Sequence, residues 1–87
     1  MPNRHEIDDT LGWIYHNKGL TSLAVATLKQ SVKAVPQSAV YLCHLGLAYA
    51  QNGDKAEARE LLDRALKLDP SFDGAEDARK VRRFLQG

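Results

Sequence analysis

Apolar residues recur at intervals of three and four along the whole chain, the spacing that gathers side chains on one face of an α-helix. No segment alternates apolar and polar residues at a period of two, so no β-strand is expected. Glycine, proline and capping residues divide the pattern into five helical segments. These cover about residues 5–17, 22–35, 39–52, 55–69 and 73–85. The pattern therefore predicts an all-α protein.

The predicted helix ends carry start and stop signals. Asn3 and Glu6 have the spacing of a capping box, and Gly19 suits the left-handed residue that ends a helix. Thr21 is predicted to cap the second helix. The remaining boundaries are predicted from Pro36, Ser38, Gly53, Pro70 and the capping-box pairs Asp54–Glu57 and Asp73–Glu76. Four helices should thus form two antiparallel pairs, each joined by a tight glycine turn.

The sequence also repeats itself after 34 residues, the interval from Leu11 to Leu45. The coinciding pairs are Leu11/Leu45, Gly12/Gly46, Tyr15/Tyr49, Gly19/Gly53, Ala24/Ala58, Leu28/Leu62, Lys33/Lys67 and Pro36/Pro70. Small residues recur where paired helices would cross closely, and breaker residues recur where a helix would end. One structural unit is therefore present twice.

The Leu-Gly and Tyr of the first helix, the turn Gly, the Ala and Leu of the second helix and the closing Pro resemble the tetratricopeptide repeat. The resemblance implies an α-solenoid within a single domain. Its parts would be a first repeat over about 5–38, a second over about 39–72 and a capping helix over about 73–86. Ser31 and Asp8 depart from the family pattern, and the polar Asp8 suggests that the first repeat lies at an end.

Two further stretches of sequence suggest which kind of longer protein the chain resembles. The Leu-Gly-Trp of the first repeat and the Asp-Gly-Ala-Glu-Asp-Ala-Arg near the C-terminus are similar to the C-terminal repeats of long bacterial tetratricopeptide proteins, some of them tied to polysaccharide export and sorting. This similarity implies that the chain is a fragment of a longer array.

Composition narrows the functional classes. The net charge is +1 with both signs interspersed, so no bulk attraction to nucleic acid or anionic membrane is expected. A single cysteine, Cys43, excludes an internal disulfide. The sequence has no apolar run long enough to span a membrane and no export leader, which predicts a cytoplasmic location unless the chain comes from an exported parent.

Three histidines are the only residues that suggest acid–base or metal chemistry. His16 and His44 are expected on neighbouring helices near Cys43, a set that could ligate zinc, but a fourth ligand is missing and polar surface roles are favoured. The glycines do not follow a strand, so they form no phosphate loop. No catalytic arrangement or cofactor motif is found. We therefore predict no enzyme activity, no catalytic residue, no metal site and no cofactor.

The resemblance places binding of a protein partner on the concave face, which the first helix of each pair lines in such arrays. Trp13 beside Leu47 would anchor a partner, while Asn17 and Gln51 would bond its backbone. The predicted peptide-binding groove consists of Glu6, Asp9, Trp13, His16, Asn17, Cys43, His44, Leu47 and Gln51. It lacks the cations of a carboxylate clamp, so an apolar or aromatic segment with a basic residue is the expected ligand.

Two other surfaces suggest alternative functions. An apolar stripe of Ile7, Leu11 and Ile14 on the first helix has no predicted cover, which favours a homodimer. A basic run near the C-terminus suggests nucleic-acid binding, although cations in the last turns of a helix also complement its dipole, and a solvated role is favoured. The basic residues are Arg79, Lys80, Arg82 and Arg83.

The fifth helix is predicted to cover the fourth. Its apolar residues are expected on one side, against the surplus of leucines in the fourth helix. They are Ala75, Ala78, Val81, Phe84 and Leu85.

Overall fold

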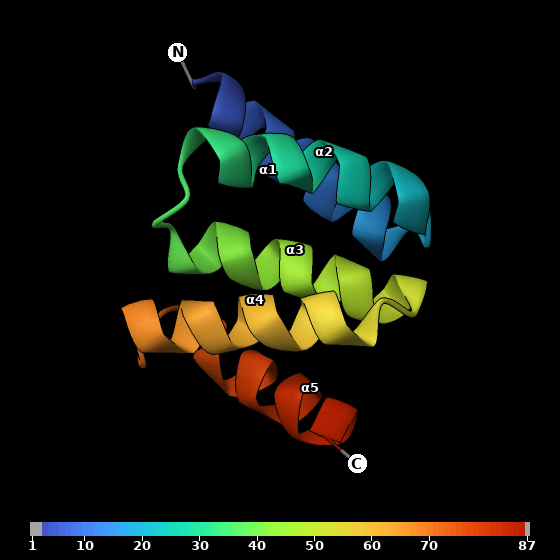
Figure 1. Cartoon of the computed structure of the whole chain (residues 1–87). Helices are drawn as coiled ribbons and strands as arrows, with labels where there is room; N and C mark the ends of the chain where they lie inside the picture. The colour runs from blue at the N-terminus through green and yellow to red at the C-terminus, as the bar shows by residue number, and fades with distance from the viewer. Residues whose placement is uncertain (1–2, 87) are drawn as a thin grey trace.

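The structure is a computed structural model that describes residues 3–86, and these residues form five helices and no strand. The helices are α1 (Arg4–Asn17), α2 (Thr21–Ala34), α3 (Ala39–Asn52), α4 (Lys55–Leu68) and α5 (Ala75–Gln86). Figure 1 shows a stack in which the pair α1/α2 lies on the pair α3/α4, and α5 covers the far side of α4. The predicted all-α solenoid is confirmed.

The helices of each pair cross closely at a glycine. A Cβ added at Gly12 would lie 2.5 Å from Cγ of Leu28, and one at Gly46 would lie 3.0 Å from Cγ of Leu62. Both leucines are completely buried. Since the two contacts are one repeat apart, the repeated glycines are explained by the same close approach in each pair.

Several predicted helix ends are confirmed. The Asn3 backbone N–H donates to the Glu6 carboxylate at 3.4 Å, which completes the capping box of α1. The Ser38 hydroxyl accepts from the Tyr41 N–H at 3.2 Å at the start of α3. Gly19 and Gly53 adopt φ values of 77° and 88°, a backbone conformation that favours glycine at a helix stop.

Two predicted helix starts are wrong, and Asp54 takes the predicted cap position of α4 without a side-chain cap bond. Helix α2 begins at Thr21 and Leu20 takes the cap position, because the Ala24 N–H already bonds the Leu20 carbonyl. At the start of α4, the Asp54 carboxylate accepts from the Asn52 side chain at 2.8 Å and makes no cap bond. Helix α5 begins at Ala75, beyond the predicted Asp73. In the case of Asp54, the connecting turn uses the carboxylate that would otherwise cap the helix.

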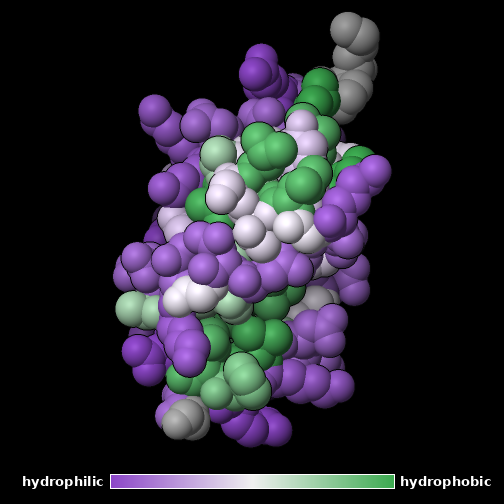
Figure 2. Space-filling model, turned by 90° about the vertical axis from the view of Figure 1, so that its right-hand side faces the viewer, coloured by the Kyte–Doolittle hydropathy of each residue, from purple (hydrophilic) through white to green (hydrophobic). Residues whose placement is uncertain are grey.

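The core runs through the stack and leaves apolar side chains on its ends. Ser31 is fully buried, and its hydroxyl donates to the Leu28 carbonyl at 2.8 Å, so the polar residue fits the family's alanine position. The exposed large apolar residues of the described chain are Ile7, Leu11, Ile14, Leu20, Leu23, Leu68 and Phe84. Helix α3 carries none of them. Figure 2 shows two apolar areas, toward the two ends, with a polar band between them.

Helix α5 covers α4 and also contacts α3. Ala75, Ala78 and Leu85 are buried, and Val81 is half-buried, as the predicted stripe requires. Phe84 is 80% exposed, so its predicted place in the stripe is wrong. Consecutive residues point about 100° apart around a helix, and the burial of Leu85 turns Phe84 away from the core.

Candidate functional site

The predicted groove residues gather where α1 and α3 face each other. We define the α1–α3 face as the predicted groove set without Cys43. Its members are Glu6, Asp9, Trp13, His16, Asn17, His44, Leu47 and Gln51. Glu6, Asn17 and Gln51 are exposed, and the other five are half-buried.

Trp13 is the centre of this face. Its ring stacks on His44 with the ring centroids 4.2 Å apart and on His16 with the centroids 4.7 Å apart, at interplanar angles of 22° and 21°. Trp13 is therefore only partly exposed, because two imidazoles stack on its ring. Leu47 packs partly on the hydrophobic core. The stack joins the two first helices of the repeats into one ordered surface.

Two polar contacts between α1 and α3 flank the stack. His44 Nδ1 donates to the Asp9 carboxylate at 2.8 Å. His5 Nδ1 and the Tyr41 hydroxyl lie 2.9 Å apart. The sequence reasoning did not foresee either contact and did not include His5 or Tyr41 in the groove. The repeat interval was an available signal, because residues of stacked equivalent helices meet at separations close to the repeat length.

The electrostatics of this face are set by burial and by its carboxylates. Burial lowers the pKa of His16, the nearby His44 lowers it further, and the Gln51 side chain acts in the opposite direction. The Nδ1 atom of His16 is buried without a hydrogen-bond partner. Burial also raises the pKa of Tyr41, with added contributions from Asp9 and then Glu6. Charge uptake by His16 is therefore disfavoured, while two carboxylates act on the Tyr41 hydroxyl.

Cys43 does not belong to this face. Only 2% of its surface is exposed, and burial raises the pKa of its thiol to about 12, with a further contribution from Asp77 of α5. The prediction that Cys43 contacts a ligand is wrong because the helix turns this side chain into the core. Within residues 3–86 no group of three or more histidine, cysteine or carboxylate side chains is arranged to hold a metal ion.

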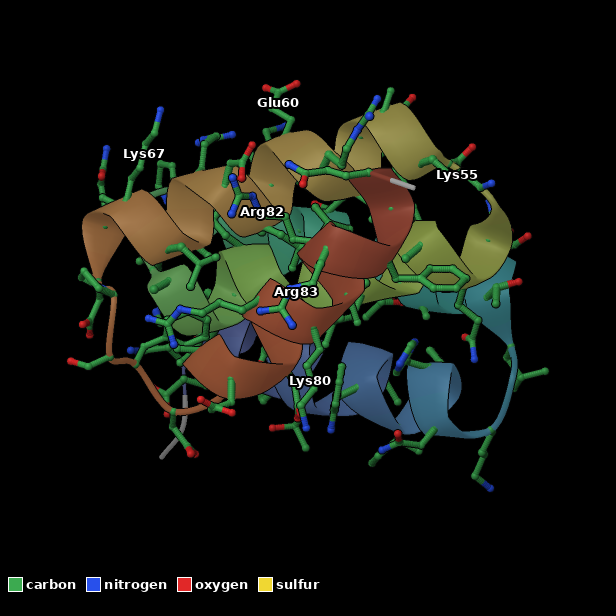
Figure 3. The ribbon with its side chains drawn as sticks, turned by 90° about the horizontal axis from the view of Figure 1, so that it is seen from below. Lys55, Glu60, Lys67, Lys80, Arg82 and Arg83 are labelled. Carbon is green, nitrogen blue, oxygen red and sulfur yellow. The ribbon has the colours of Figure 1, made fainter. Side chains whose placement is uncertain are left out.

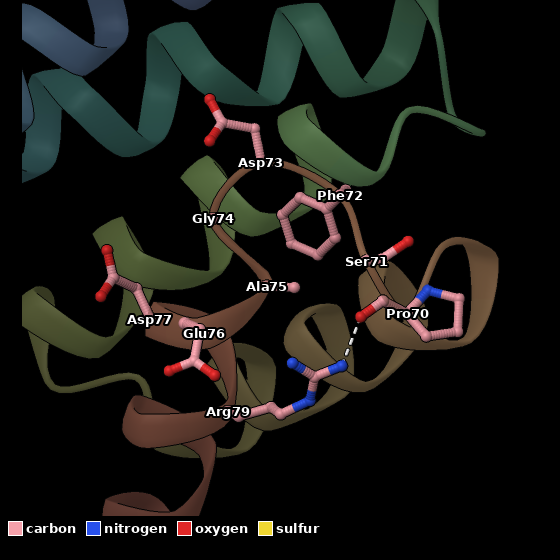
Figure 4. Close-up of a pocket in the computed structure, with 9 residues that line it drawn as sticks. All are labelled: Pro70, Ser71, Phe72, Asp73, Gly74, Ala75, Glu76, Asp77 and Arg79. Atoms are coloured by element: carbon pink, nitrogen blue, oxygen red, sulfur yellow. Dashed lines mark hydrogen bonds between the residues drawn. The ribbon is translucent and has the colours of Figure 1, made fainter.

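Two of the four predicted basic residues are engaged within the chain. Arg82 pairs with Asp63 of α4, and Arg79 donates to the Pro70 carbonyl in the turn before α5, as Figure 4 shows. In Figure 3, Lys80 points to the side of the molecule formed by α1, and Arg83 lies apart from it on α5. Two of the four cations thus contact other groups of the chain, and the other two extend from different positions on α5.

The α1 stripe is exposed as predicted. Ile7, Leu11 and Ile14 are 47%, 38% and 45% exposed, and they line a shallow cleft with Glu6 and Thr10. The equivalents of Leu11 and Ile14 in the second repeat are Leu45 and Ala48, which are 4% and 0% exposed. The first repeat covers those residues, whereas no described segment covers the stripe.

Comparison with known families agrees with this architecture. Sequence models of the tetratricopeptide repeat match residues 9–38 and 39–72, which together make up most of the chain. The chain belongs to the tetratricopeptide repeat family. Tetratricopeptide repeats typically act in protein–protein interaction and are not themselves catalytic. In this tetratricopeptide repeat protein, no helix within the described residues is long and apolar enough to cross a membrane.

Two curated relatives share part of the chain. Cellulose synthase operon protein C of Escherichia coli (strain K12) is 43% identical over 54 residues, which cover 62% of this chain and 5% of that protein. The probable UDP-N-acetylglucosamine–peptide N-acetylglucosaminyltransferase SPINDLY of Solanum lycopersicum is 38% identical over 55 residues, which cover 63% of this chain and 6% of that protein. The chain thus spans about one twentieth of the length of these relatives.

Proposed function

We propose that the chain is a non-enzymatic protein-interaction module whose α1–α3 face binds an extended segment of a partner protein. The observation that carries this proposal is the position of Trp13, a large aromatic residue that lies outside the hydrophobic core yet is held in one orientation by His16 and His44. A surface ordered before binding loses little conformational entropy when a partner docks. The stack therefore favours recognition over a purely structural role.

The amides beside the stack supply the second element of the proposal. Asn17 and Gln51 are one repeat apart and both are exposed. Side-chain amides both donate and accept hydrogen bonds, so a pair of them can bond two peptide groups of an extended chain. Contact with the exposed edge of Trp13 would supply the apolar part of the interface.

The test is selection of short random peptides on the immobilised chain, followed by affinity measurements on the enriched peptides. Replacing Asn17 and Gln51 together with alanine should weaken binding about 30-fold, since each lost hydrogen bond is worth about 1 kcal/mol. Glu60→Ala, on the outer side of α4, is the matched control and should bind as the unchanged chain does. A library that yields no binder, or binders equally sensitive to Glu60→Ala, would overturn the proposal.

One of the relatives suggests a more specific kind of partner protein. The likeness to cellulose synthase operon protein C supports a partner connected with a bacterial polysaccharide, and a role in export or sorting stays a prediction. Recovery of such a component on the chain, with loss on the double alanine variant, is the expected result. Recovery of unrelated proteins only would remove this context and leave the general binding role.

Self-association is a second candidate, favoured by the exposed α1 stripe. Its equivalents are buried by the neighbouring repeat, so a second copy of the chain meeting it stripe to stripe would give the same kind of cover. Sedimentation equilibrium up to about 0.5 mM, where weak contacts of millimolar Kd become visible, should show a dimer. Leu11→Glu should abolish it and Leu68→Glu, an equally exposed leucine on α4, should not. A monomer throughout would exclude this function.

A further inference from the structure

All three histidines of the chain lie on or beside the α1–α3 face. His16 and His44 stack on Trp13, and His5 contacts Tyr41 next to the same surface. The carboxylates of Glu6 and Asp9 lie among them, and both act on the Tyr41 hydroxyl. The imidazoles of the described chain are therefore concentrated where the proposed function places the partner.

Two cations of α1 and α5 are paired with other carboxylates, and Lys80 of α5 points to the side of the molecule formed by α1. Arg4 pairs with Asp8 at 3.4 Å, and Arg82 pairs with Asp63 on α4. Asp77 of α5 adds a further carboxylate near Cys43, behind the face. With neutral histidines, the face thus carries the charge of Glu6 and Asp9, and its complement is a cationic side chain.

We propose that the α1–α3 face recognises a lysine- or arginine-containing segment while its histidines are neutral, and releases it when they become protonated. This inference rests on the proposed function and adds the partner's chemistry and its control by pH. Each proton that an imidazole takes up adds a positive charge beside the two carboxylates. A cationic segment that is attracted near neutral pH is then held less strongly in mild acid.

Each of the three histidine rings faces other charged or polar groups of the chain. The Asp9 carboxylate accepts a hydrogen bond from His44, and His16 and His44 both stack on Trp13, where the nearby His44 opposes a charge on His16. His5 lines a cleft between α1 and α2, which adds charged groups from both helices. The groups facing the three rings are Asp9, Tyr41 and Gln51, together with Arg4, Asp8 and Lys33 around His5.

The test uses peptides selected from the random library on the intact chain, synthesised and titrated at about pH 7.5, 6.5 and 5.5, which bracket histidine titration. The enriched peptides should contain lysine or arginine, and affinity should fall at least tenfold across this range. Circular dichroism at each pH checks that the chain remains folded. Binders without basic residues, or basic binders whose affinity is unchanged from high to low pH, would overturn the inference and leave the binding role intact. A library without binders would instead overturn the proposed function.

Two variants separate charge from folding. Glu6→Gln keeps the capping-box geometry and removes one charge, so it should weaken a basic peptide about threefold to fivefold at about pH 7.5, before any histidine is protonated. Glu60→Gln, on the outer side of α4, should leave affinity unchanged. His16→Phe keeps a ring against Trp13 but cannot take up a proton, so it should reduce the loss of affinity in acid. Equal effects of the two glutamine variants, or an unaltered pH profile for His16→Phe, would contradict the inference.

Discussion

Replacing Gly12 with alanine tests the helix crossing inside the first repeat. The added Cβ would lie 2.5 Å from Cγ and 2.7 Å from Cδ2 of Leu28, which is fully buried and has no open space to move into. Overpacking of this kind costs about 1 to 3 kcal/mol, while alanine in place of a helical glycine returns about 1 kcal/mol. A 2.5 Å contact calls for the upper part of that cost, about 2 to 3 kcal/mol, so we expect the free energy of unfolding to fall by about 1 to 2 kcal/mol.

Gly46→Ala is the comparison within the same molecule. Here the nearest side-chain atoms, both of Leu62, lie 3.0 Å from the added Cβ, so a shift of a few tenths of an ångström relieves the contact. The helix-propensity gain then nearly offsets the strain, and we expect a change below about 0.5 kcal/mol. The two glycines are equivalent in the repeat, but their distances to the facing leucine differ.

The assay is urea unfolding followed by circular dichroism. Ala26→Gly, at an exposed position of α2, calibrates the alanine–glycine difference in this chain and should cost about 1 kcal/mol. Removing the facing side chain with Leu28→Ala should make Gly12→Ala stabilising in that background, a coupling that a double-mutant cycle measures. Equal losses for the two glycine variants, or no coupling to Leu28, would refute the close crossing.

Three further outcomes are expected. Leu85→Ser should lower the free energy of unfolding in urea by about 2 to 3 kcal/mol, because Leu85 joins α5 to the core. Phe84→Ser should lower it by less than about 0.5 kcal/mol, because Phe84 is exposed. Equal losses would contradict the observed rotation of α5. Cys43, buried and with a pKa of about 12, should react with a thiol reagent at about pH 8 only as fast as the chain opens, and fast labelling without denaturant would contradict its burial. His16 should titrate in NMR spectra below about pH 6.5, the usual histidine value. Because the pKa of His16 is lowered on folding, the native state binds fewer protons than the unfolded state. The free energy of unfolding should therefore decline as the pH falls below about 6.5. This decline should be smaller in His16→Phe.

The sequence alone determined the number of helices, their approximate limits and the stacking of two equivalent pairs. These features depend on local chemistry: helical apolar spacing, the left-handed glycines Gly19 and Gly53, and the small residues at the crossings. The repeat interval also predicted how the two helix pairs are arranged, because a duplicated pattern of apolar residues must be buried in the same way twice. The face formed by α1 and α3 was also predicted, through the family resemblance.

Only the tertiary structure decided what the side chains of that face contact. The stacking of Trp13 on two histidines and the burial of Cys43 depend on how far α3 is rotated and shifted against α1 and α5. The rotation of α5 likewise decides that Phe84 is exposed while Leu85 is buried. A helical pattern defines which residues share a face, but a rotation of a few tens of degrees changes which neighbour that face meets. That rotation is set by the packing of residues distant in sequence, and a single sequence does not record it.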